Sequence, residues 1–186
     1  MHFFTKMKKF LYQEIKIPEG VQITIEGNLF SIKGPEGENK REFKIGKLNI
    51  ENKGNILKIG NDKSTKSEKK LMNSIRAHVR NMIKGVQKKF EYKLKICSSH
   101  FPMTVKIEGN QALIKNFLGE KVDRHSVILP GVNVKVEKEI ITITSVEKEL
   151  AGQTAANFET ATKIRNRDRR IFQDGIYIIN KAGKEM

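Results

Sequence analysis

Apolar and polar residues alternate along the first third of the chain. Val21, Ile23 and Ile25 are separated by polar residues, and this period of two is typical of a strand with one buried face. Glycine-containing turns interrupt the alternation at residues 27–28 and 34–37, so the pattern predicts a small antiparallel meander. The predicted strands cover residues 21–26, 29–33, 40–45, 48–51 and 56–59.

The period changes to that of a helix after residue 65. Apolar residues now recur every three or four positions, which places them on one face of a helix. Thr65 and Glu68 have the spacing of a capping box, and Gly85 marks the far end of the helix. The predicted apolar face consists of Leu71, Ile75, Val79, Met82, Ile83 and Val86.

The second half of the chain repeats this order of patterns. The sequence Ile-Glu-Gly-Asn at residues 25–28 returns at 107–110, and Glu-Lys-x-Leu at 68–71 returns at 147–150. Further strands are predicted at 132–136 and 140–144, and a second capping box at Thr144 and Glu147. The matching order of blocks indicates a tandem duplication of a meander followed by a helix.

Each repeat must bury one face of its helix against one face of its sheet. The sequence therefore predicts an α+β fold with two tandem duplicated domains, each a small, mainly antiparallel β-sheet with one helix packed on one face. We expect a basic N-terminal extension at residues 1–12, a first domain at 13–90 and a second domain at 91–186 that carries a C-terminal basic arm.

The charge of the chain predicts a polyanionic partner. Lysine and arginine total 36 against 21 acidic residues, which gives a formal net charge of +15. A surplus of this size attracts nucleic acid or an anionic membrane. The sequence contains no run of about 18 apolar residues, the length that spans a membrane. Neither predicted helix joins a lysine-rich face to a large aromatic face, so we expect no membrane partner. The single cysteine, Cys97, excludes an internal disulfide and fits a reducing compartment.

Arginine concentrates in one short segment, although lysine dominates the basic residues elsewhere. Residues 163–170 hold five cations and one acid, Asp168, ahead of a turn dipeptide at 174–175 and an apolar strand at 176–179. Guanidinium groups bind phosphate oxygens bidentately. The alternative is a run of charged residues that is only solvated and binds no ligand. We interpret the segment as an arm that binds nucleic acid. Its cations are Lys163, Arg165, Arg167, Arg169 and Arg170.

The duplication and the C-terminal segment together resemble the universal large-subunit ribosomal protein six family, in its eukaryotic and archaeal branch. The resemblance covers nearly the whole chain, and it includes the sequences at residues 82–86 and 116–121. Thr160 departs from the branch, which usually has glutamine there. The C-terminal signature is carried by Ile164, Arg167, Arg170, Phe172, Asp174, Gly175, Ile176, Tyr177, Ile178 and Lys181.

The resemblance implies a structural rRNA-binding protein of the cytoplasmic large ribosomal subunit, near the sarcin–ricin loop and the base of the stalk. The expected partners are rRNA, neighbouring large-subunit and stalk-base proteins, and translational GTPases that dock nearby. The second domain is expected to supply much of the rRNA contact, through phosphates and 2′-hydroxyl groups more than through base edges. The alternative is a non-ribosomal RNA- or DNA-binding module.

Two further regions complete the expected RNA contacts. The turn at 116–119 is equivalent to the turn at 34–37, and we expect it to lie nearer to RNA because Lys115, Asn116 and Lys121 surround it. Tyr177 is a candidate to stack on a base, although its strand position favours partial burial equally. Lys181 ends the C-terminal signature.

Neither a catalytic site nor a metal site is expected. Cys97 and His100 alone supply too few ligands for a tetrahedral zinc ion. The Gly-x-x-Gly sequence at 34–37 resembles the loop of a KH domain, but predicted strands flank it, so it is interpreted as a hairpin turn. No spacing pairs a nucleophile with a base, and Asp174 is interpreted as part of the turn that closes the arm. We therefore expect no enzyme activity and no cofactor.

Overall fold

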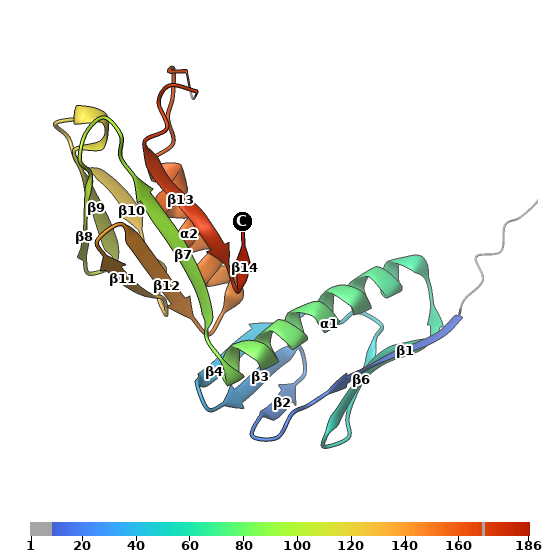
Figure 1. Ribbon diagram of the computed structural model, residues 1–186. Coiled ribbons are helices and arrows are strands. Elements are labelled where there is room, and N and C mark those ends of the chain that lie inside the picture. Colours follow the sequence, from blue (N-terminus) through green and yellow to red (C-terminus); the bar gives the residue numbers. More distant parts are fainter. Residues whose placement is uncertain (1–8, 169) are drawn as a thin grey trace, which may run out of the picture. The chain divides into compact units, whose positions relative to one another are not determined.

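The computed structural model describes residues 9–168 and 170–186 of the chain. It divides into two compact units, one that ends at Lys88 and one that runs from Lys89 to Met186 (Figure 1). Residues 1–8 of the expected extension, and Arg169 of the predicted arm, lie outside the described residues. Across the part of the chain that is described, no helix is long and apolar enough to cross a membrane.

Unit 1 contains six strands and one long helix. The strands form two antiparallel three-stranded sheets with the orders β1-β6-β5 and β2-β3-β4. The elements are β1 (Lys9–Lys16), β2 (Gln22–Glu26), β3 (Leu29–Gly34), β4 (Gly37–Glu42), β5 (Asn49–Asn52), β6 (Ile56–Ser64) and α1 (Lys66–Gln87).

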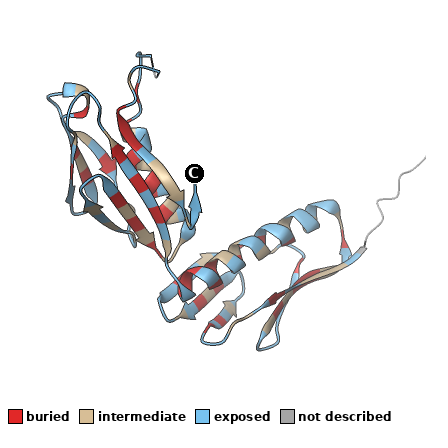
Figure 2. Cartoon of the chain, in the orientation of Figure 1, coloured by how far each residue is buried: buried red, intermediate tan, exposed pale blue. Residues whose placement is uncertain are grey.

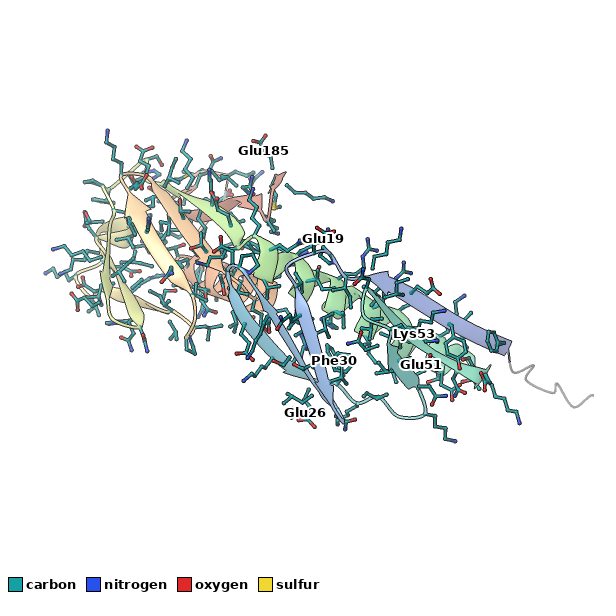
Figure 3. All side chains as sticks on the ribbon, turned by 90° about the horizontal axis from the view of Figure 1, so that it is seen from below. Glu19, Glu26, Phe30, Glu51, Lys53 and Glu185 are labelled. Atoms are coloured by element: carbon teal, nitrogen blue, oxygen red, sulfur yellow. The ribbon has the colours of Figure 1, made fainter. Side chains whose placement is uncertain are left out.

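Helix α1 forms the core of unit 1 with both sheets. The predicted capping box is present, because the Thr65 N–H donates to the Glu68 carboxylate. The predicted apolar face is buried except for the half-buried Leu71, and the helix contacts β1, β3, β4 and β6. Figure 2 shows burial along the side of α1 that faces the strands and exposure on the opposite side. Phe30 of β3, labelled in Figure 3, is fully buried in this core.

Unit 2 repeats this plan and extends it. Its strands form a three-stranded sheet of order β10-β9-β8 and a five-stranded sheet of order β11-β12-β7-β13-β14. Helix α2 packs on strands of both sheets, and its Phe158 is fully buried. The elements are β7 (Phe90–Cys97), β8 (Thr104–Glu108), β9 (Gln111–Lys115), the short 3-10 segment η1 (Phe117–Gly119), β10 (Arg124–Val127), β11 (Asn133–Glu137), β12 (Ile140–Ser145), α2 (Lys148–Ala161), β13 (Gly175–Lys181) and β14 (Lys184–Glu185).

The structure confirms the α+β class and the duplication, but each unit divides its strands between two sheets where one was expected. Helix α1 has 22 residues and is therefore about 33 Å long, at about 1.5 Å per residue. The apolar face of α1 contacts β1 and β6 of one sheet and β3 and β4 of the other, so the two small sheets cover it together. In addition, residues 9–12, expected in the extension, belong to β1 and pair with β6.

The second predicted capping box is wrong. Thr144 lies inside β12, where it pairs with Asn133 and Glu91, and Glu147 is itself the N-cap residue of α2. The Glu147 N–H instead donates to the hydroxyl of Ser145 at 3.2 Å. The strand continues one residue beyond the predicted end, so the side chain that serves the start of the helix belongs to Ser145.

Candidate nucleic-acid interface

The basic arm, defined here as residues 163–173, connects α2 to β13 at one end of unit 2 (Figure 1). Arg170 forms a bidentate ion pair with Asp168, and these contacts lower the pKa of the Asp168 carboxyl. Within the described residues, Lys163 and Arg165 form no ion pair, so their charges can meet an external anion. The predicted cations that the structure shows as exposed are Lys163, Arg165, Arg167 and Arg170.

Thr162, the C-cap residue of α2, fixes the first end of the arm. Its hydroxyl donates to the Phe158 carbonyl at 3.2 Å and accepts the Ile176 N–H at 2.9 Å, so it joins α2 to β13. Ile164 then returns to the core and is only 6% exposed. The arm therefore starts from buried, hydrogen-bonded residues, although its cations face solvent.

Asp174 fixes the second end of the arm. It is 2% exposed, and its Oδ1 accepts the N–H groups of Ser99 at 2.6 Å and His100 at 3.0 Å. Its Oδ2 contacts His100 Nδ1 at 2.6 Å and accepts the Ser99 hydroxyl at 3.3 Å. Burial acts to raise the pKa of Asp174, but the hydrogen bonds from His100 and Ser99 outweigh it and lower the pKa to about 2. The charged carboxylate thus ties the loop after β7 to the arm.

Ser99, His100 and Asp174 have the residue types of a hydrolase triad, but their geometry differs. Both Ser99 Oγ, at 3.2 Å, and Asp174 Oδ2 contact the same ring nitrogen, His100 Nδ1. A triad needs the carboxylate on one ring nitrogen and the hydroxyl on the other, so that the ring can accept the hydroxyl proton. This cluster therefore has a structural role, and it agrees with the interpretation of Asp174 as part of the turn that closes the arm.

An aromatic ring links this network to one of the predicted arginines. The Phe172 ring stacks on His100 with ring centroids 5.0 Å apart, and the Arg167 guanidinium carbon lies 4.9 Å from the centroid of the same ring. Such a cation–π contact restricts a guanidinium while leaving its N–H edge available for hydrogen bonds. Arg167 is therefore partly oriented before any ligand binds.

The loop between β9 and β10 lies at the same end of unit 2 as the arm (Figure 1). Asn116 has a left-handed backbone, with φ of 59°, and its amide donates to the Pro102 carbonyl at 3.0 Å. Phe101 is 47% exposed, and its ring lies against Gly119, where an added Cβ would be 3.4 Å from it. The loop after β7 thus contacts both the arm and the turn at 116–119.

Arg124 connects the β9–β10 loop to the helix that carries the arm. It forms a bidentate ion pair with Glu120, lies 4.2 Å from the Phe117 ring centroid, and donates to the Ala161 carbonyl at 2.8 Å. Cations near the last carbonyls of a helix are favourable. The pKa of Glu120 is lowered by Arg124 and, to a smaller extent, by Arg167, so the loop and the arm also interact electrostatically.

The structure brings most of the predicted contact residues to this one end of unit 2, but not all of them. Lys121 and Asn116 are exposed there, and Lys115 is exposed in an ion pair with Asp123 at 3.2 Å. Tyr177 is 40% exposed at the start of β13, so it is neither in the core nor fully free. Lys181 is the last residue of β13, six residues beyond Gly175 at its start and therefore about 20 Å from it at about 3.3 Å per residue, and it is not part of the cluster.

Sequence reasoning missed the residues whose contacts hold this surface together. His100 was considered only as a metal ligand, although the described residues contain no group of three or more side chains that could hold a metal ion. Phe101 and Arg124 were not considered as parts of the site at all. The C-terminal signature contains both Phe172 and Asp174, and it was the one signal in the sequence that pointed to residues that hold the arm in place.

The fold and the surface first define a class, a duplicated α+β protein with an arginine-rich end that suits a polyanion. The model of the family "Ribosomal protein L6" matches residues 17–89 and 101–175. The chain is 44% identical to the large ribosomal subunit protein uL6 of Methanobrevibacter smithii over 169 residues. The matched residues make up 91% of this chain and 95% of that protein. It is 43% identical over 172 residues to the uL6 protein of Methanococcus vannielii, covering 92% and 94% respectively.

The chain therefore belongs to the ribosomal protein L6 family. Members of this family are structural components of the large ribosomal subunit and are not enzymes. This finding confirms the resemblance that the duplication and the C-terminal signature indicated, and it confirms the expected class of ribosomal protein.

Proposed function

We propose that this chain is a structural constituent of the large ribosomal subunit that binds rRNA near the sarcin–ricin loop and the base of the stalk. It would there support the region in which translational GTPases dock, beside neighbouring large-subunit and stalk-base proteins. One observation carries the proposal: exposed arginines project from an arm whose two ends are fixed by Thr162 and Asp174.

Fixing the ends of the arm matters because binding by a mobile segment costs ordering entropy. The Asp174 carboxylate, the His100 ring and the Phe172 ring form a continuous set of contacts that ends at the Arg167 guanidinium. The arm is thus partly preorganised. Arg165 and Arg167 contribute phosphate contacts that position the protein on folded RNA without reading its sequence.

The β9–β10 loop widens this contact surface. Lys121 and Asn116 are exposed beside the arm, and Phe101 offers a half-exposed ring on which a base can stack. Tyr177 offers a second ring at the start of β13. Lys115 contributes less, because Asp123 already neutralises part of its charge.

A salt series with the complete chain and full-length large-subunit rRNA tests the role of the arm. Each lost phosphate contact flattens the slope of log K against log salt by about 0.9 on duplex RNA and about 0.7 on single strands. The variant Arg165→Ala/Arg167→Ala should therefore flatten the slope by about 1.4 to 1.8. The matched control is Lys148→Ala/Lys184→Ala, which removes two exposed charges at the start of α2 and on β14, away from the arm.

Equal slopes for the arm variant and the control would show that the arm is only a solvated charge run. Hydroxyl-radical footprinting of the same complexes tests the proposed location, with protection expected at the sarcin–ricin loop and the stalk base. Protection confined to other rRNA helices contradicts that location. Sedimentation through high-salt sucrose gradients tests the alternative of a non-ribosomal binding module, because such a module leaves the large subunit and a ribosomal protein stays with it.

A further inference from the structure

Unit 1 contains a cationic groove that the arm does not explain. It lies between the second half of α1 and the segment that connects β1 to β2, and its volume is about 710 Å³. Arg76, Arg80 and Lys84 line its α1 side, and Lys16 lies on its β1 side. We call it the α1 groove.

The three helical cations form one row. Residues four apart lie on the same face of a helix and are separated by about 6 Å along its axis, at about 1.5 Å per residue. Three like charges in such a row repel one another, which disfavours the row unless a ligand neutralises it. Ile83, which is buried, lies next to the row and supports it from the core.

The described residues supply no ion-pair partner for Arg76, Arg80 or Lys84. The Nε of Arg76 is buried and has no hydrogen-bond partner among these residues, so the described part of the chain leaves this N–H unsatisfied. Two acids also line the groove, but Glu14 pairs with Lys58 at 2.8 Å, and that contact lowers the pKa of Glu14. Glu19, labelled in Figure 3, remains as the one acid of the lining without a cationic partner among the described residues.

The type of cation is also informative. Unit 1 has 16 lysines and only three arginines, and two of those arginines line the α1 groove. Arginine presents a planar fork that binds a phosphate with two hydrogen bonds, and it is less strongly hydrated than lysine. The concentration of the rarer cation in one hollow therefore points to a ligand that bears phosphate.

We propose that the α1 groove binds the phosphate backbone of RNA, as a second contact that is separate from the arm. This inference rests on the proposed function only in taking that RNA to be rRNA. A nucleic-acid strand offers a row of phosphates to the row of cations. An acidic protein segment is the weaker candidate, because no aromatic side chain lines the groove and protein interfaces depend on buried aromatic anchors.

The test uses the complete chain and full-length large-subunit rRNA in a salt series. The variant Arg76→Gln/Arg80→Gln should flatten the slope of log K against log salt by about 1.4 to 1.8, as expected for two lost phosphate contacts. The control, Lys66→Gln/Lys70→Gln, removes two exposed charges from the first turns of the same helix, outside the groove, and should leave the slope nearly unchanged. Arg76→Lys/Arg80→Lys keeps the charge without the fork and should give an intermediate affinity.

A second measurement does not depend on the folding of those variants. A photo-cross-linking residue in place of Lys84, in an otherwise unchanged chain within the large subunit, should form cross-links to rRNA. Cross-links to protein alone, or identical slopes for the groove variant and its control, overturn the proposal. If the arm variant then still flattens the slope, only the groove is refuted. If the arm variant also has no effect, the proposed function fails with it.

Discussion

Units 1 and 2 share one plan but differ at two places, and both places concern the proposed RNA surface. Sheet β5-β6-β1 of unit 1 matches β11-β12-β7 of unit 2, and in each the first strand of the unit pairs with the strand that precedes the helix. In unit 2 the other edge of β7 is extended by β13 and β14, whereas β1 has no second partner among the described strands. The arm is the connection that leads to that added strand.

The second difference is the connection between the second and third strands of sheet β2-β3-β4 in unit 1 and of sheet β8-β9-β10 in unit 2. In unit 1, Gly34 and Gly37 pair across a two-residue turn, and the Glu36 N–H donates to the Val86 carbonyl of α1 at 2.9 Å. In unit 2, the equivalent connection spans residues 116–123 and carries Lys121 and exposed Asn116. The first turn is hydrogen-bonded to its own helix, whereas the second connection is longer and exposes Asn116 and Lys121.

The comparison teaches that duplication supplied two similar scaffolds, and that the segments differing between them carry the proposed contacts. Function on a shared fold usually lies in its loops and added segments, because the core tolerates little change. The α1 groove is an exception to this rule, because Arg76, Arg80 and Lys84 belong to helix α1 and not to a loop or an added segment. The following predictions test how far the two units differ.

The largest expected effect comes from the two equivalent cores. Phe158→Ala in α2 and Phe30→Ala in β3 each remove a fully buried ring, and each should lower the free energy of unfolding by about 3–5 kcal/mol. Only Phe158→Ala should also loosen the arm, because the cavity left by the ring lies one helical turn before Thr162, whose hydroxyl accepts the Ile176 N–H. Hydrogen exchange of the Ile176 amide measures this. Equal loss of its protection in both variants would contradict the separation of the two units.

The next effect concerns Asp174, which has no counterpart in unit 1. A pKa lowered to about 2 means that its stabilisation is fully present above its unfolded value of about 3.9 and is lost as the pH falls towards 2. The shift corresponds to about 2.5 kcal/mol, so Asp174→Asn should cost about that much near neutral pH. The variant should also lose the part of the acid dependence between pH 4 and 2 that the wild type owes to this carboxylate.

Urea unfolding across that pH range, for the wild type and for Asp174→Asn, measures both effects. Asp168→Asn is the matched control, because Asp168 is an exposed carboxylate of the same arm and its ion pair contributes little. An unchanged acid profile in Asp174→Asn would show that the bonds from Ser99 and His100 do not stabilise the fold.

The two equivalent turns should respond differently to added bulk. A Cβ at Gly34 would lie 2.8 Å from the Val86 carbonyl oxygen, so Gly34→Ala should cost about 1–3 kcal/mol by pushing the turn away from α1. Gly119 has a φ of +75°, so Gly119→Ala should cost about 1–2 kcal/mol through backbone strain. Thermal unfolding measures the costs, and rRNA footprinting should show a local change for Gly119→Ala only. A local footprint change for Gly34→Ala would place the first turn on RNA as well.

Much of this fold follows from local patterns in the sequence. The period of two predicted the strands near Val21 and Ile140, and the period of three to four predicted both helices, because each period reports which face of an element is buried. The edge strand β1 was missed, since Phe10, Leu11 and Tyr12 do not alternate with polar residues. The division into two sheets was missed because periodicity does not identify a strand's partner.

The sequence predicted the positive charge of the candidate site, but it did not predict the contacts that hold its residues in place. The arginines of the arm stand out because they are adjacent in sequence. The contacts that hold them do not, since Asp174 and Ser99 are 75 residues apart and meet only once β13 pairs with β7. Arg76 and Arg80 were hidden for a similar reason: their spacing is typical of any solvated helix, and only the packing of α1 beside the β1–β2 connection turns them into a lined groove.

The smallest expected effect concerns the ring beneath Arg167. Phe172→Leu keeps an apolar side chain but removes the stack on His100 and the face that the guanidinium covers. A contact of this kind is worth about 0.5–1 kcal/mol, so the stability should change by no more than that, and rRNA affinity should fall by about two- to fivefold as Arg167 loses its orientation.

Phe43→Leu is the matched control in unit 1, where the Arg41 guanidinium carbon lies 5.5 Å from the Phe43 ring centroid. Because Phe43 is buried, the control should cost about 1 kcal/mol of stability and leave rRNA affinity unchanged. Affinity and urea unfolding are measured on both variants. If Phe43→Leu weakens rRNA binding as much as Phe172→Leu does, the ring in the arm has no orienting role beyond packing, and the two units are more alike in function than their loops indicate.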